Sequence, residues 1–172
     1  QALALPIRSV GVKADLLAYE HPVLLTGDAP WEAILNAASA VTKDVPGINR
    51  CVWNLEPDPP LSASPIPATA TKERLDLLRE ADHLVMELLR RHHLYHEIWQ
   101  CPTVLVPLRL GDRTGEMVVL RPVISERAMT ARPYPLPEAV LEDLREGVLG
   151  LPGVGSLVLD VTSKPPGTIE WE

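Results

Sequence analysis

The end of the chain carries residue types that suit the binding of a phosphorylated ligand. Lys164 precedes two prolines and a glycine, and Glu170 and Trp171 follow close behind. The prolines stiffen the backbone and the glycine permits an unusual turn, which is not the composition of a frayed terminus. A lysine ammonium is a compact point charge that attracts phosphate, and a carboxylate accepts hydrogen bonds from a sugar or a purine edge. Residue type alone leaves a solvated lysine and an exposed terminal carboxylate as the commoner alternatives.

Two further groups of polar side chains have residue types that suit the binding of a ligand or a metal ion. Gln100 follows a helical segment and precedes an apolar run, and its amide both donates and accepts hydrogen bonds. His92, His93 and His96 are spaced so that they could reach one metal ion from a helix end, but only Glu97 is available to complete the set. We therefore predict a basic helix terminus and no metal site.

Composition restricts the class of protein. The net charge of −7 disfavours nucleic acid as a partner, because phosphate backbones require clustered Lys and Arg. No apolar run approaches the ~20 residues that a membrane span needs, so no membrane partner is expected. Cys51 and Cys101 lie within apolar runs and are predicted to be reduced, buried thiols of a cytoplasmic protein. The chain begins with Gln1 and a strand-like segment, which suggests a piece of a longer polypeptide.

An internal repeat organises the chain. Pro46-Gly47 and Pro152-Gly153 each end a helical pattern and lead into an apolar run, and two copies of strand–strand–helix–strand explain this spacing. The first copy is expected to have strands at 6–12, 16–25 and 48–55. Its helix is expected to begin after Asp28 as the capping residue, with Pro30 in its first turn.

The second copy follows the same order. Strands are expected at 104–110, 116–125 and 154–161, and a helix from Pro137 whose buried stripe is Val140, Leu141, Leu144 and Val148. Before it, a long helix is expected from Thr71 to about His93. The face of that helix is predicted to carry Leu75, Leu78, Asp82, Val85, Leu89 and His92.

These elements predict an α+β fold of two related subdomains. Each would be a helix-covered, antiparallel three-stranded sheet, and the long helix would precede the second sheet. The predicted boundaries are 1–56 for the first subdomain, 57–69 for a proline-rich linker, and 70–172 for the second subdomain with its C-terminal tail.

Several motifs resemble the C-terminal dimerisation region of glutamine-hydrolysing GMP synthase, in the variant with two subdomains. The tail Ser-Lys-Pro-Pro-Gly-Thr-Ile-Glu-Trp-Glu is the longest and most specific of them. The others are Leu5 to Val12, Gln100-Cys101-Pro102 with Val106-Pro107-Leu108, and Val118 to Arg121 followed by Met129-Thr130.

The resemblance implies a substrate role for Lys164, Glu170 and Gln100, as contacts to xanthosine monophosphate (XMP). It implies a parent enzyme that aminates XMP to GMP with ATP, Mg²⁺ and glutamine-derived ammonia, in cytoplasmic purine biosynthesis. It also implies a homodimer and an ATP pyrophosphatase domain acting in cis or in trans. This sequence has no glycine-rich phosphate loop and no amidotransferase triad, so no catalytic residue and no bound cofactor are expected in it.

Two departures from the family pattern keep an alternative open. Ser64 stands where the two-subdomain members have an aspartate contact, so that Asp58 would have to replace it or the contact is missing. Arg127-Ala128 stands where the family prefers Asp-Phe. A stand-alone dimerisation or regulatory module that has lost substrate binding therefore remains the alternative, and a nucleic-acid-binding domain is a distant third.

Overall fold

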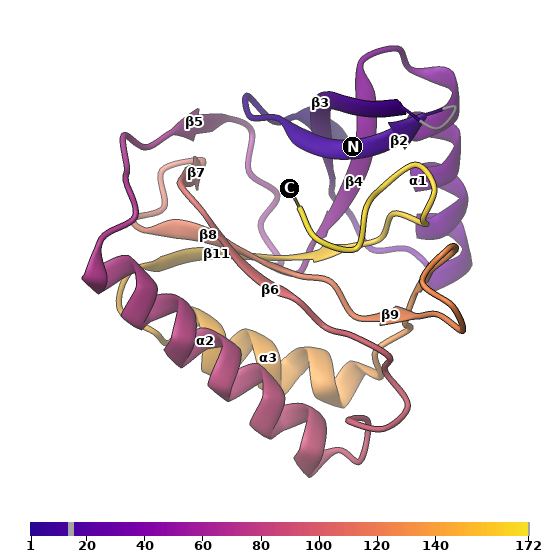
Figure 1. The fold of residues 1–172 in the computed structure, drawn as a ribbon. Helices are drawn as coiled ribbons and strands as arrows, with labels where there is room; N and C mark the ends of the chain where they lie inside the picture. The colour runs from indigo at the N-terminus through magenta and orange to yellow at the C-terminus, as the bar shows by residue number, and fades with distance from the viewer. Residues whose placement is uncertain (14–15, 172) are drawn as a thin grey trace.

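The first unit of the fold is a strand–strand–helix–strand arrangement preceded by one short strand (Figure 1). The structure is a computed structural model that describes residues 1–13 and 16–171. The elements are β1 (Ala2–Ala4), β2 (Ser9–Lys13), β3 (Leu16–Leu25), α1 (Trp31–Asp44) and β4 (Ile48–Asn54). The proline-rich stretch that follows contributes only the short strand β5 (Ala63–Pro65).

The second unit begins with the long helix α2 (Lys72–Arg91). Its other elements are β6 (Thr103–Val106), β7 (Leu108–Leu110), β8 (Glu116–Leu120), β9 (Val123–Ile124), β10 (Arg132–Pro133), α3 (Glu138–Leu149) and β11 (Val154–Asp160). The order β8, α3, β11 repeats the order β3, α1, β4. The α+β class predicted from the sequence is confirmed.

The strands of both units join in one mixed sheet of order β1-β3-β4-β11-β8-β6, with β2 paired to β3. Within each unit the strands that flank the helix, β3 with β4 and β8 with β11, are parallel. The expectation of purely antiparallel sheets is therefore corrected: a helix between two strands returns the chain to the end from which it started. The antiparallel pair β4–β11 connects the units. The subdomain boundaries at 1–56, 57–69 and 70–172 stay a prediction.

All three helices of the described chain contribute to one core with the sheet. In Figure 1, α2 and α3 lie side by side below β6, β8 and β11. The stripe predicted for α3 is confirmed, since its buried residues are Val140, Leu141, Leu144 and Val148.

The buried face of α2 agrees with the predicted one at Val85 and Leu89 but is rotated from it elsewhere. Its fully buried residues are Ala81, Val85, Leu88 and Leu89, and Leu77 packs against them. Leu75, predicted to be on that face, is 42% exposed. The spacing of Leu77, Ala81 and Leu88 fits helical periodicity equally well, so periodicity alone did not distinguish the two stripes.

The predicted start of the long helix at Thr71 agrees with the structure, whereas the capping residue predicted for α1 is wrong. Thr71 caps α2, and its hydroxyl accepts a hydrogen bond from the Arg74 N–H at 3.3 Å. Asp28 does not cap α1: the capping position is Pro30, and no side chain bonds there. Pro30 has an extended conformation outside the helix, and its carbonyl accepts from Ala33 and Ile34. The capping position therefore lies two residues after the predicted one, and the helix starts at Trp31.

A second core fills the opposite face of the sheet. It contains Leu24, Val52, Val119 and Val158 from four central strands, and Trp171 of the tail packs into it. The tail is therefore part of the folded structure rather than a free end.

Both cysteine thiols are buried, as predicted. Burial raises the pKa of Cys51 and of Cys101 to about 12, so both are protonated at neutral pH. Among the helices that the structure describes, none is long and apolar enough to cross a membrane.

We expect Leu89→Ala to lower the free energy of unfolding by about 2–5 kcal/mol, because it leaves a cavity in the core. Leu89 is 2% exposed. Leu75→Ala in the same helix is the matched control and should change stability by less than about 0.5 kcal/mol. Urea unfolding followed by circular dichroism measures both, and equal losses would contradict the observed face of α2.

We expect neither thiol to react with Ellman's reagent in the native protein at pH 7. The thiolate is the reactive form, and both thiols are buried and protonated. Both should react after unfolding in guanidinium chloride. A thiol that titrates quickly under native conditions would contradict the burial of Cys51 or Cys101.

Candidate functional site

The tail leaves β11 and runs back across the molecule between the two units. On the side of the second unit, Lys164 and Ala131 exchange two backbone hydrogen bonds, of 2.9 and 3.1 Å. This pairing fixes the backbone of Lys164 from both directions. Its side chain is half-buried.

On the side of the first unit, the tail lies along β2. The Val12 N–H donates to the Pro166 carbonyl at 2.7 Å, and the Val10 N–H donates to the Trp171 carbonyl at 3.3 Å. Gly11, between them, faces Gly167. A Cβ on Gly11 would lie 2.8 Å from the Pro166 carbonyl oxygen, so this close approach requires glycine.

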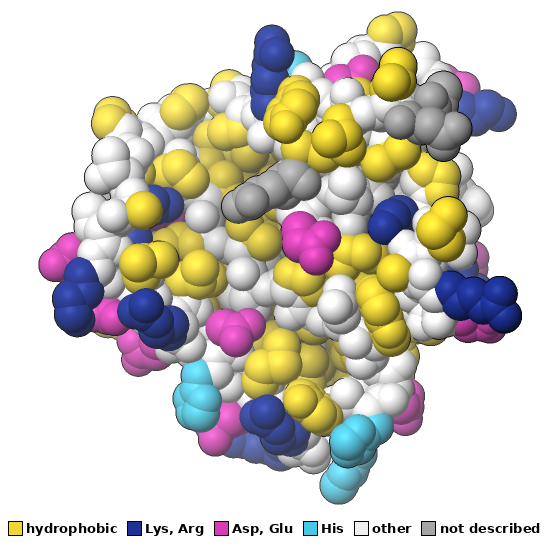
Figure 2. Space-filling model, viewed as in Figure 1, with side chains coloured by type: hydrophobic (Ala, Val, Ile, Leu, Met, Phe, Trp, Pro, Cys, Tyr) yellow, Lys and Arg dark blue, Asp and Glu magenta, His cyan; other side chains and the backbone are white. Residues whose placement is uncertain are grey.

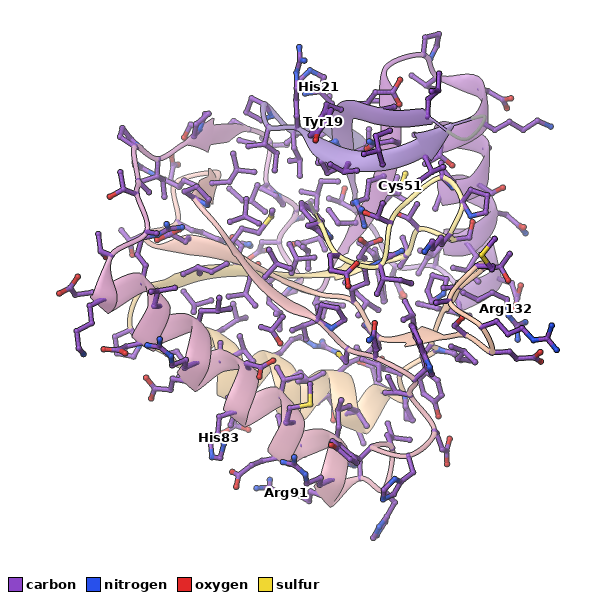
Figure 3. The ribbon with its side chains drawn as sticks, viewed as in Figure 1. Tyr19, His21, Cys51, His83, Arg91 and Arg132 are labelled. Carbon is purple, nitrogen blue, oxygen red and sulfur yellow. The ribbon has the colours of Figure 1, made fainter. Side chains whose placement is uncertain are left out.

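Lys164 lines a cleft of about 800 Å³. The cleft lies between the tail and the loop that joins β9 to β10, and Figure 3 shows Arg132 at this edge of the molecule. Its polar lining consists of Ser125, Glu126, Arg127, Thr130, Arg132, Ser163 and Lys164. Three cationic side chains and one carboxylate give the cleft a net positive charge within an acidic protein, which suits an anionic ligand.

The loop on the far side of this cleft contains the Arg127-Ala128 departure. The Ser125 hydroxyl donates to the Thr130 carbonyl at 2.7 Å and accepts from the Ala128 N–H at 2.9 Å. Ala128 has φ +59°, a left-handed conformation that is uncommon outside glycine. The serine side chain therefore closes the loop around a strained residue.

Glu170 and Gln100 do not line the cleft of Lys164. Glu170 is exposed. Its negative charge, like that of Asp160, raises the pKa of the Arg121 guanidinium, but burial has the larger effect and lowers that pKa. Gln100 is also exposed, and its backbone pairs with Val123 in β9. The next residue of β9, Ile124, lines the cleft. Strand β9 therefore lies between Gln100 and the cleft.

The residues of the proline-rich stretch lie elsewhere. Ser64 is an exposed residue of β5, opposite Arg109 of β7. The Asp58 carbonyl accepts from Arg113 at 2.7 Å. In Figure 1, β5 and β9 lie on opposite sides of the view, and neither Ser64 nor Asp58 lines the cleft of Lys164.

The histidines near the end of α2 do not converge. His92 Nε2 lies 2.7 Å from Asp143 of α3 and ties the two helices together, while His93 and His96 are exposed. Over residues 1–13 and 16–171, no group of three or more His, Cys, Asp and Glu side chains is arranged to hold a metal ion.

Sequence reasoning missed a cluster of buried charges beneath the tail. Arg50 of β4, Asp160 of β11 and Arg121 after β8 are all fully buried. Asp160 accepts from Arg50 Nη1 at 2.6 Å and from Arg121 Nη1 at 2.7 Å. Thr162 also belongs to this region: its N–H donates to Asp160 at 2.9 Å.

The ionisation of Asp160 follows from its neighbours. Burial by itself would raise its pKa, but Arg121, Arg50 and the Thr162 N–H hold that pKa below its usual value. This charge therefore contributes to stability above the pKa of an unfolded aspartate, and the contribution is lost as the pH falls through the lower folded pKa.

A signal for this cluster was present in the sequence. Arg50, Arg121 and Asp160 each stand within or directly after an apolar strand segment. Charged residues are almost never fully buried unless they are paired. Three such exceptions could have indicated a buried network, although not which residues pair.

Comparison with known proteins gives two kinds of match. The family described as GMP synthase C terminal domain matches residues 87–171. A probable glutamine-hydrolysing GMP synthase of Leptospira interrogans is 40% identical over 98% of this chain, and the alignment covers 28% of that relative. The chain thus corresponds to well under half of that relative's length.

Other relatives align with a shorter part of the chain. The glutamine-hydrolysing GMP synthases of Streptomyces coelicolor and Thermosynechococcus vestitus are 52% and 45% identical, each over 59% of this chain. The alignments cover 21% and 20% of those relatives. Through residues 87–171, the chain therefore belongs to the GMP synthase C-terminal domain family.

Proposed function

We propose that this chain is the dimerisation and XMP-binding portion of a glutamine-hydrolysing GMP synthase of purine biosynthesis. The observation that carries the proposal is the position of Lys164, whose backbone is fixed by Ala131 at the mouth of a positively charged cleft. A cleft of about 800 Å³ is within the usual range for a site that encloses a small ligand.

In this proposal Lys164 binds the phosphate of XMP as a point charge, and Arg127 and Arg132 add to the attraction. Glu170 accepts hydrogen bonds from the ribose or the purine edge. Gln100, one strand away from the cleft, supplies an amide to the same nucleotide. Trp171 acts through packing, since it is buried in the second core.

The chemistry of amination belongs to other parts of the parent enzyme. We place ATP, Mg²⁺ and the activation of the purine oxygen in an ATP pyrophosphatase domain, and the release of ammonia in an amidotransferase domain. The contribution of this chain is to hold XMP in place, which lowers the entropic cost of the reaction. We propose a cytoplasmic location, in keeping with the biosynthetic role.

We also propose that the chain forms a homodimer through the sheet surface of the first unit. Leu17 and Tyr19 are exposed apolar residues on one face of β3. Figure 2 shows hydrophobic side chains gathered over β2 and β3 at the top of the view. A patch of this kind can form a self-complementary twofold interface.

We expect Lys164→Met to weaken XMP binding by roughly 10- to 100-fold, the cost of losing a charge-assisted contact of about 1.5–3 kcal/mol. The measurement is calorimetric titration of XMP in the presence of the ATP pyrophosphatase domain. Lys72→Met is the matched control, because Lys72 pairs with Asp76 on an exposed surface of α2. Equal binding by wild type and Lys164→Met would remove the phosphate role, and no binding by wild type would favour the dimerisation or regulatory module.

We expect the double substitution Leu17→Lys and Tyr19→Lys to convert the dimer to a monomer, because it places charges in an apolar contact. Sedimentation velocity at several concentrations measures the change. Leu61→Lys, at an exposed residue of the proline-rich stretch, is the control and should leave the dimer intact. A dimer that survives the double substitution would show that another surface mediates association.

A further inference from the structure

The first unit holds the tail through one buried guanidinium. Arg50 Nη2 donates to the Thr168 hydroxyl at 2.9 Å and to the Glu170 carbonyl at 3.2 Å. The same nitrogen donates to the Val10 carbonyl at 2.9 Å. Arg50 therefore joins the end of the tail to β2 and β4.

The two carboxylate oxygens of Asp160 accept hydrogen bonds from groups at opposite ends of the tail. Oδ2 accepts from Arg50 Nη1 at 2.6 Å and from the Trp171 indole N–H at 2.9 Å. Oδ1 accepts from Arg121 at 2.7 Å and from the Thr162 N–H at 2.9 Å. One carboxylate thus fixes residues on both sides of Lys164.

Arg121 completes the arrangement at the start of the tail. Its Nη1 donates to the Thr162 carbonyl at 3.0 Å. Arg50 also stacks on the ring of Trp171, with its Cζ 5.1 Å from the ring centroid. The tail is therefore held at Thr162 and from Thr168 to Trp171, with Lys164 between these anchored ends.

We propose that Arg50 is a positioning residue that sets the tail in its nucleotide-binding conformation. Asp160 holds Arg50 in place through an ion pair, and Arg121 pairs with the other oxygen of the same carboxylate. The first unit thereby contributes to XMP binding without touching the nucleotide. This inference rests on the proposed function of Lys164 and Glu170. It assigns a binding role to a strand that lies outside the family match at residues 87–171.

The chemistry of Arg50 makes the proposal specific. Its planar fork donates to Asp160, Thr168, Val10 and Glu170 at once. A lysine ammonium at the same place keeps the charge but cannot reproduce this fork. Arg50→Lys should therefore keep the ion pair with Asp160 while releasing the end of the tail.

The test compares Arg50→Lys with wild type by hydrogen exchange and by calorimetric titration of XMP, with the ATP pyrophosphatase domain present. The Val10 and Val12 amides report on the tail, because they donate to the Trp171 and Pro166 carbonyls. We expect these amides to exchange faster in Arg50→Lys and XMP to bind at least about tenfold more weakly. In wild type, XMP should slow the same exchange, since coupling between two sites is reciprocal.

Arg74→Lys is the matched control. Arg74 makes a two-pronged ion pair with Glu116, at 2.7 and 2.8 Å, and none of its hydrogen bonds reaches the tail. We expect this variant to leave both the exchange of Val10 and Val12 and the affinity for XMP unchanged. If Arg50→Lys does not fold, Thr168→Val takes its place, because it removes the hydroxyl that joins Arg50 to the Val10 carbonyl.

The outcomes separate the two proposals. Faster exchange with unchanged XMP affinity would overturn the positioning role and leave the proposed function intact, as would unchanged exchange and affinity. Absence of XMP binding by wild type would overturn the proposed function and this inference together. Weaker binding with faster exchange in Arg50→Lys, but not in Arg74→Lys, supports both.

Discussion

The carboxylate of Asp160, buried between Arg50 and Arg121, is the interaction on which the arrangement of the tail depends. A buried ion pair adds little net stability, because desolvation offsets the attraction, but loss of one partner leaves an uncompensated charge and is costly. The cluster therefore acts as a constraint: β4, β11 and the end of β8 must keep their relative positions. The indole of Trp171 joins the same carboxylate, so the tail is subject to the same constraint.

The duplicated fold explains how such a cluster arises. The antiparallel pair β4–β11 places Val52 opposite Asp160 and brings Arg50 of the first unit within hydrogen-bonding distance of the second. The helices cover one face of the sheet, and the tail closes part of the other. The tail, which extends the second unit, is thus held by hydrogen bonds from residues of the first.

Local patterns predicted much of the fold. The strand at Leu16–Leu25, the stripe of α3 and the start of α2 next to Thr71 follow from side-chain periodicity and from residues next to each other in the chain. The same reasoning failed where two choices of capping residue or of buried stripe fitted the local sequence equally well. The start of α1 at Trp31 and the buried face of α2 were decided by the contacts that each helix makes with the rest of the core.

The sequence by itself determined the α+β class, the repeat and the residues of the tail that suit a nucleotide. Only the tertiary structure decided that Lys164 borders a cleft apart from Gln100 and Glu170, and that Arg50 pairs with Asp160. The physical reason is distance along the chain. Periodicity reports which side of an element is buried, whereas the pairing of residues 110 positions apart depends on which strands become neighbours.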